Sequence, residues 1–227
     1  PTSVTCIDRT TGALCPGYPH LLTVGSSDTI GPAAVVGSKL YVHVSTADTY
    51  AQTTPIALYC WDTATDSTCG LIIVTRVLDH TSNIGGSAPR VVGGKLYLAA
   101  DTGLLYCVDP ATGSACAGFP LASGLETDLN GGYSYDSVAH GNRLFVSNGS
   151  TSTTTCFDVS VPARCAGWTP AKSLHSPDIV NHHSTAGVAD GVCSVNNASG
   201  ECFLDNGTTA TTDGWPVNEL YYSISEE

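Results

Sequence analysis

Apolar and polar positions alternate along short stretches of this chain, and glycine-containing turns separate the stretches. In residues 33–44, 89–100 and 136–147, an apolar run and a two-residue glycine turn precede Lys or Arg, Leu, an aromatic residue and an aliphatic one. Alternation with a period of two predicts half-buried β-strands, and a glycine turn between two of them predicts a hairpin. Helix-period patterns are missing, so the sequence predicts an all-β fold.

A second hairpin is predicted downstream of each of these, and it carries two cysteines. In the copy at residues 106–116, Pro110–Gly113 read as a four-residue turn. Such a turn places Asp109 opposite Ser114 and Cys107 opposite Cys116. Directly opposed residues of antiparallel strands lie about 4.5–5.5 Å apart at Cα, which is within the range for a disulfide.

The cysteine count extends this reading to the whole chain. All ten cysteines form pairs separated by nine residues, and no CxxC or closely spaced Cys–His pattern typical of zinc or redox sites occurs. We therefore expect five disulfides: Cys6–Cys15, Cys60–Cys69, Cys107–Cys116, Cys156–Cys165 and Cys193–Cys202. Each one contributes on the order of 2–3 kcal/mol in the chain-entropy model. Disulfides at this density imply an oxidising compartment, so we expect a secreted or extracellular-surface protein.

The two hairpins together form a repeat of four antiparallel strands. Its first cysteine recurs at positions 6, 60, 107 and 156. Four short strands per roughly 40–50 residues are typical of a β-propeller blade. We expect one β-propeller domain over residues 1–227 with about five blade units, either a complete ring or part of a longer propeller.

The last repeat differs from the others. Aligned on a turn at Asp190-Gly191, Cys202 takes the place of Cys107, and Cys193 falls on the preceding strand where other repeats carry Leu. The alternative alignment puts Cys193 itself on Cys107. The tail at 218–227 resembles the second strand of a blade, so it is a candidate either for closing the ring or for self-association through an edge strand.

The pattern C-x-D-x-x-T-G, at Cys6–Gly12 and Cys107–Gly113, resembles the repeat of pyrroloquinoline-quinone-type (quinoprotein-like) β-propellers. The resemblance implies a propeller fold. In that family a docking Trp follows the turn, whereas here the second cysteine stands there. The family's enzymes have about eight blades, a calcium-bound quinone and adjacent cysteines. This chain is too short for eight blades and has no Cys-Cys pair, so we expect no cofactor.

Four aspartates stand at equivalent places, two residues after the first cysteine of their repeats. We interpret Asp8, Asp62, Asp109 and Asp158 as turn-capping acceptors of backbone N–H groups. A calcium loop at Asp62 and Asp66 is the alternative. The weak metal candidates are three histidines of one connection, His175, His182 and His183.

Sequons and aromatic residues offer further candidates. Glycosylation is predicted, for a glycosylating host, at Asn148, Asn197 and Asn206. Aromatic residues after glycine, at Tyr18, Phe119, Trp168 and Trp215, are expected to fill gaps between blades. Trp61 lies in a different register and is the better candidate for an exposed sugar-stacking surface.

Charge narrows the range of partners. Only 12% of residues are charged, with eight Lys and Arg and a net charge of −12, so neither nucleic acid nor an anionic membrane is an expected partner. No stretch is long enough for a membrane span. No triad or nucleophile pattern occurs.

We expect a non-enzymatic module for adhesion or extracellular assembly that binds protein or glycan at the cell surface. The alternatives are a lectin-like propeller and a fragment of a quinoprotein-like or glycan-cleaving enzyme.

The pairing scheme makes a direct prediction about thiols. Since five local pairs account for all ten cysteines, intact mass after alkylation without reductant should show no added label. Two or more labels would contradict the scheme, and alkylation after reduction, with ten labels, is the control.

Overall fold

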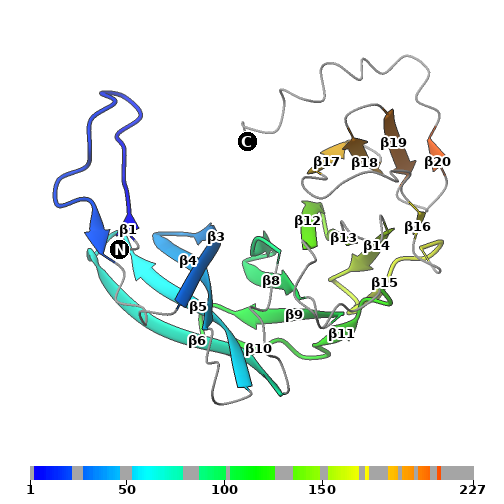
Figure 1. Cartoon of the computed structure of the whole chain (residues 1–227), viewed down its shortest axis with the longest axis horizontal. Coiled ribbons are helices and arrows are strands. Elements are labelled where there is room, and N and C mark those ends of the chain that lie inside the picture. Colours follow the sequence, from blue (N-terminus) through cyan, green and yellow to red (C-terminus); the bar gives the residue numbers. More distant parts are fainter. Residues whose placement is uncertain are drawn as a thin grey trace.

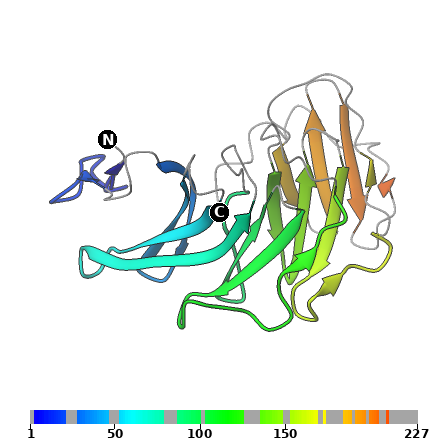
Figure 2. The same ribbon diagram turned by 60° about the horizontal axis from the view of Figure 1, so that its bottom comes forward.

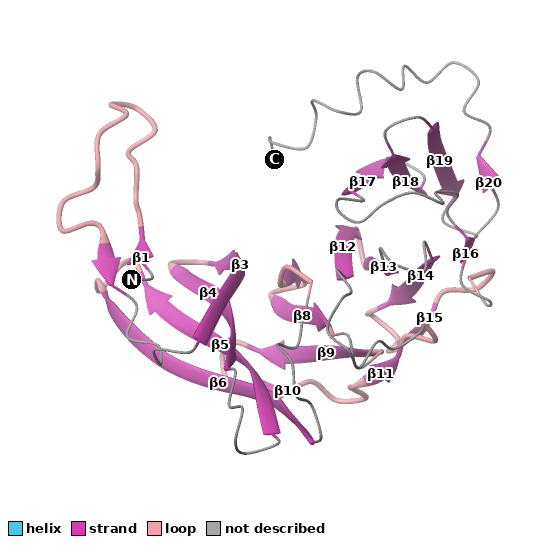
Figure 3. Ribbon diagram, viewed as in Figure 1, coloured by secondary structure: helices cyan, strands magenta, loops and turns pink. Residues whose placement is uncertain are grey.

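Strands and turns make up all of the structure that can be described. The computed structural model describes residues 3–21, 28–46, 53–78, 87–100, 103–125, 135–148, 153–168, 172–173, 184–188, 191–196, 199–204 and 209–210. Within these ranges the secondary structure is entirely β (Figure 3). They contain no helix that is long and apolar enough to cross a membrane.

Four antiparallel sheets follow one another along the chain. Sheet I contains β3 (Asp28–Val36), β4 (Lys39–Thr46), β5 (Thr53–Asp62) and β6 (Ser67–Leu78). Sheet II contains β7 (Arg90–Val92), β8 (Lys95–Ala99), β9 (Leu104–Asp109) and β10 (Ser114–Ala115), with β11 (Leu121–Ala122) also paired to β9. Sheet III repeats this plan with β12 (Tyr135–His140), β13 (Arg143–Asn148), β14 (Thr153–Asp158), β15 (Ala163–Arg164) and β16 (Lys172–Ser173).

Sheet IV and a separate hairpin complete the set. Sheet IV contains β17 (Ser184–Val188), β18 (Gly191–Asn196), β19 (Ser199–Leu204) and β20 (Thr209–Ala210). The first hairpin, residues 3–21, contains β1 (Ser3–Val4) and β2 (His20–Leu21). The five expected blade units are therefore four sheets of at least four strands and this hairpin.

The sheets are arranged as blades around a common centre. Figure 1 shows them one after another along an arc, and in Figure 2 they follow one another as stacked layers. The first strands of successive sheets contact each other, β3 with β7, β7 with β12, and β12 with β17. They lie toward the concave side of the arc, as the innermost strands of propeller blades do.

The predicted glycine turns connect the first two strands of three sheets. Val92 pairs with Lys95, so Gly93 and Gly94 form a two-residue turn, and both have positive φ, 56° and 74°. Two positive φ values define the type I′ turn, whose twist matches that of the flanking strands. The pairs Val36–Lys39 and His140–Arg143 close the equivalent turns.

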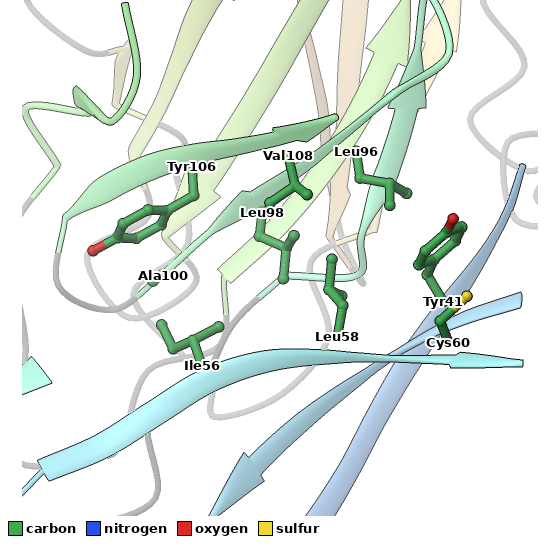
Figure 4. Close-up of a cluster of buried hydrophobic side chains, with 9 residues drawn as sticks. All are labelled: Tyr41, Ile56, Leu58, Cys60, Leu96, Leu98, Ala100, Tyr106 and Val108. Carbon is green, nitrogen blue, oxygen red and sulfur yellow. The ribbon is translucent and has the colours of Figure 1, made fainter. Parts of the chain in front are cut away.

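The core lies between neighbouring sheets. One cluster joins sheet I and sheet II: Tyr41, Ile56, Leu58 and Cys60 face Leu96, Leu98, Ala100, Tyr106 and Val108 (Figure 4). A second cluster joins sheets II and III in the same way through Tyr97, Leu105, Leu144 and Phe157. Sheet II therefore contributes one face to sheet I and the other face to sheet III.

Period-two alternation explains how a single strand serves both neighbours. In β8, Leu96 and Leu98 belong to the cluster with sheet I, whereas Tyr97 and Ala99 belong to the cluster with sheet III. Successive side chains of a strand point to opposite faces. The second and third strands of a blade are thus apolar on both faces because both faces are covered.

Truncation of a buried leucine tests this packing. Leu58 is 0% exposed in the cluster between sheets I and II, while Leu71, on the adjacent strand β6, is 54% exposed. Leu58→Ala should lower the free energy of unfolding by about 2–5 kcal/mol. The matched Leu71→Ala should change it by less than about 0.5 kcal/mol. Denaturant unfolding measures both, and equal effects would contradict the face-to-face packing.

Candidate functional site

The stapled hairpins are the most regular feature of the molecule, and four of the five expected disulfides are present. We use this name for residues 6–15, 60–69, 107–116 and 156–165. Their Cα–Cα distances are 5.3, 5.0, 5.3 and 5.3 Å in that order. Free cysteines are absent from the residues whose side chains the structure describes. The staple ties the third strand of a blade to its outer edge.

The strand register around the staples is as predicted in the clearest copy. Asp109 pairs with Ser114 and Val108 with Ala115, and the Cys116 N–H donates to the Cys107 carbonyl at 3.0 Å. The staple of sheet I has a different register. Cys60 pairs with Gly70 across β5 and β6, so Cys69 lies at a bulge.

The backbone register also bears on the fifth pair. Cys193 of β18 lies directly opposite Cys202 of β19. Their side chains, and hence the bond, lie outside the described residues. This register agrees with the alignment of Cys202 on Cys107 and corrects one detail of it. Val188 pairs with Gly191, so β18 already begins at Gly191 and Cys193 takes the place of Tyr97, not of a Leu.

Each of the four aspartates accepts hydrogen bonds from the turn that follows it. Asp8 accepts from the Thr10 N–H at 2.7 Å, Asp62 from the Ala64 N–H at 2.9 Å, Asp109 from the Ala111 N–H at 2.9 Å and Asp158 from the Ser160 N–H at 3.0 Å. These are the bonds of an Asx turn. They place the carboxylates in structural roles in all four stapled hairpins.

The same bonds stabilise the ionised form of each carboxylate. The Thr10 N–H holds the pKa of Asp8 below its ordinary value, and the Ala64 N–H does so for Asp62. Hydrogen bonding to the Lys95 ammonium, and then to the Ala111 N–H, lowers the pKa of Asp109. The Ser160 hydroxyl is the main cause of the lowered pKa of Asp158.

A cation lies across the sheet from the aspartate in three blades. Lys39 pairs with Asp62, Lys95 with Asp109 and Arg143 with Asp158, each on the neighbouring second strand. In sheet II the strand pairing of β8 with β9 starts at Leu96 and Val108, and the ammonium of the preceding residue, Lys95, forms an ion pair with Asp109. The aspartate that caps the turn therefore also lies opposite a Lys or Arg at the start of the second strand in these three blades.

The aromatic candidates are packed within the molecule. Phe119 makes an edge contact with Tyr97 at a ring distance of 5.6 Å, and Trp168 makes one with Phe145 at 5.2 Å. The interpretation of Trp61 as an exposed sugar platform is wrong. Trp61 is only 8% exposed because the first hairpin covers it, with Val4 in the same cluster. Trp215 lies outside the described residues.

The first hairpin brings together a polar cluster that sequence reasoning did not detect. The His20 ring stacks obliquely on Trp61 at 4.7 Å and meets Tyr18 edge-on at 4.5 Å. The His20 Nε2 atom lies 2.7 Å from Asp66 Oδ1. Asp66 thus pairs with a histidine from another part of the chain. A calcium loop at Asp62 and Asp66 stays an untested alternative.

The remaining candidates separate into buried and undescribed residues. Asn148 is 0% exposed at the end of β13, so a glycan on its side chain is incompatible with this fold, which contradicts the predicted glycosylation at this residue. The side chains of Asn197, Asn206, His175, His182 and His183 lie outside the described residues. Among the side chains that are described, no three His, Cys, Asp or Glu residues gather as metal ligands would.

His43 is a second feature that the sequence did not signal. It is 4% exposed on β4, opposite Leu58, and its Nε2 has no hydrogen-bond partner among the described atoms. Its Nδ1 lies against Gly31, where a Cβ atom would approach it to 2.8 Å. Burial lowers the pKa of His43 from its ordinary 6.5 because the charged imidazolium loses its hydration.

Comparison with solved structures shows the fold class. The crystal structure of BamB from Moraxella catarrhalis is similar, with a TM-score of 0.50 and 14% identity over 92% of this chain and 69% of BamB. The computationally designed Ika8 protein matches with a TM-score of 0.50 and 11% identity over 80% of this chain and 60% of Ika8. No family model and no curated protein matches the chain.

Sheet arrangement and structural similarity agree. BamB and the designed protein are β-propellers, and this chain has the same architecture of repeated four-stranded blades. The protein is therefore a β-propeller with a disulfide in each described stapled hairpin. The narrower resemblance to quinoprotein-type repeats stays a prediction.

Acid titration tests the buried histidine. Since the pKa of His43 is lowered by folding, the unfolded chain binds a proton near pH 6.5 that the folded chain does not, and stability falls as pH drops below that value. One proton corresponds to a slope of at most about 1.4 kcal/mol per pH unit. His43→Leu should flatten unfolding free energy between pH 7 and 5 relative to wild type. An unchanged slope would contradict the burial.

Substitution of one turn cap tests the aspartates. Asp109→Ala should lower the melting temperature at pH 7 more than Asp109→Asn, because asparagine keeps an oxygen for the Ala111 N–H and loses only the attraction to Lys95. The lowered pKa means that this stability exists above about pH 4 and is lost as pH falls further. The gap between wild type and Asp109→Ala should therefore narrow at pH 2.5. A constant gap would exclude a role for the charge.

Proposed function

We propose that this chain is a secreted or cell-surface β-propeller module with a non-enzymatic role in adhesion or extracellular assembly. The observation that carries the proposal is the staple at the outer edge of each of four blade units. Disulfides persist in oxidising compartments, where a protein also meets proteases and shear without chaperones to refold it.

In sheets II and III the staples lie at the edges that the blade exposes. The outermost strands β10 and β15 contain only two residues each, and the chain then returns to the third strand as β11 and β16. Short outer strands reduce the unpaired backbone available to other chains. A covalent bond at the same place keeps the short strand attached. This favours a module that stays folded and whose outer edges do not pair with other chains.

The first hairpin carries three of the eight large apolar side chains that are exposed among the described residues, and two of them, Ile7 and Leu14, pair across it. Ile7, Leu14 and Leu21 are each more than half exposed. Exposed apolar groups that lie together are typical of interaction surfaces. The surface chemistry supports a protein partner, because the best aromatic candidate for sugar stacking, Trp61, is covered.

Adhesion can be measured directly. Beads coated with the oxidised chain should attach to intact cells of the producing species, and beads coated with reduced, alkylated chain should attach at least tenfold less, since the blades depend on their staples. Surface proteolysis of intact cells should release the native protein. Attachment equal for both bead types, or a protein recovered only inside cells with free thiols, would contradict the proposal.

A further inference from the structure

The first hairpin has the outer half of a blade but, within the described residues, no second strand. Its β1 pairs with β2 as β9 pairs with β11, and Cys6-Ile7-Asp8 correspond to Cys107-Val108-Asp109. In sheet II, β9 has β8 on its other side, and in sheet III, β14 has β13 there. The described residues place no strand on the corresponding edge of β1.

Exposure of Ile7 indicates that this edge is incomplete. Ile7 is 61% exposed, whereas the residues at its position in the other blades, Val108 and Phe157, are 2% and 0% exposed. Those two are covered by leucines on the second strand, because Leu96 pairs with Val108 and Leu144 with Phe157. A strand with leucine opposite Ile7 would bury it in the same way.

Asp8 adds a charge requirement to the same edge. In sheets I to III the capping aspartate has a cation on the second strand, as in the pairs Lys39–Asp62 and Arg143–Asp158. Asp8 is exposed, and the hydrogen bonds described for its carboxylate all come from residues of its own turn, Thr10 and Thr11. A lysine or arginine that entered opposite Asp8 would complete the arrangement found in the other three blades.

Tyr18 adds an aromatic requirement. Phe119 and Trp168 each lie three residues after the second cysteine, and each contacts an aromatic ring of the second strand, Tyr97 or Phe145. Tyr18 has the same position after Cys15, but its described ring contact is His20. An aromatic residue opposite Cys6 would give Tyr18 the partner that its equivalents have.

We infer that the β1 edge is an acceptor site for an antiparallel strand of a partner protein with the pattern Lys or Arg, Leu, Tyr or Phe, aliphatic. The cation lies opposite Asp8, the leucine opposite Ile7 and the aromatic residue opposite Cys6. Binding is by strand addition, in which backbone hydrogen bonds give affinity and alternate side chains give specificity. This inference rests on the proposed role in assembly and names the chemistry of the partner.

The tail of the chain itself fits this pattern less well. Residues 219–222 read Glu-Leu-Tyr-Tyr, so they have the leucine and the aromatic residue but an anion where the cation is required. Glu219 opposite Asp8 would place two like charges together across a strand pair, which is destabilising. Charge complementarity therefore favours a basic partner strand over the tail.

Titration of a peptide against the full chain tests the acceptor site. The probe is a fluorescent peptide of residues 89–100, PRVVGGKLYLAA, which carries the pattern. Its anisotropy should rise saturably, and hydrogen exchange at residues 3–8 should slow in the complex. The peptide with Lys95→Glu should bind at least tenfold more weakly. The Asp8→Lys chain should reverse this preference.

Matched variants separate the edge from other apolar surface. Ile7→Asp should weaken peptide binding at least tenfold. Leu14→Asp, at the 56% exposed residue that forms an isolated bridge with Ile7 on the side away from the acceptor edge, should change it less than threefold. The Asp158→Lys chain is the charge control. Arg143 already lies opposite Asp158, so this substitution should leave peptide binding unchanged. Circular dichroism checks the fold of every variant.

Three results would overturn the inference: no saturable binding, equal binding of the Lys95→Glu peptide, or binding that appears only when Leu220→Asp is introduced. The last would mean that the tail of the chain fills the edge. The titration needs no cells, so its outcome is independent of the bead assay. If the peptide does not bind but the beads attach to cells, only the acceptor site is excluded. Peptide binding without bead attachment would instead contradict adhesion.

Discussion

Face-to-face contact between neighbouring sheets is the interaction on which the rest of this structure depends. Tyr41 and Leu58 of sheet I meet Leu96 and Val108 of sheet II, and the next residues along β8 and β9 turn to sheet III. A four-stranded sheet with two apolar faces cannot be stable in isolation, since each face needs a cover. The blade is therefore a unit of sequence, whereas the unit of stability is a pair of adjacent blades.

In sheets II and III the staples act where this packing is weakest. The apolar clusters centre on the second and third strands, while the outer strands β10 and β15 are short and mostly exposed. A covalent link between third and outer strand restricts the unfolded chain and compensates for the few contacts at the rim. The capped turns, with Asp109 and its equivalents, hold the connection between the two cysteines in one conformation.

Local chemistry explains which parts could be predicted from sequence. Glycine turns such as Gly93-Gly94, the register from Asp109 to Ser114 and the four caps depend on residues within about ten positions of each other, so their pattern is visible in the chain. The covering of Trp61 and the burial of Asn148 depend on neighbouring sheets or on packing within a blade, which no local pattern encodes. The same is true of His43 against Gly31 and of His20 beside Asp66.

The residue opposite the third-strand cysteine differs between sheet IV and sheets I to III, and this difference goes with a different expected pairing of the cysteine. It is held by Tyr41, Tyr97 and Phe145 in sheets I to III, and in these blades the cysteine bonds outward to the rim. In sheet IV the position is held by Cys193, directly opposite Cys202, and no cysteine follows Cys202 in the sequence. An aromatic ring at that position fits a blade whose rim is stapled, since in sheets II and III it contacts the aromatic residue after the second cysteine. A cysteine at this position places the fifth predicted disulfide between the second and third strands of sheet IV, whereas the four disulfides that the structure describes lie toward the rim.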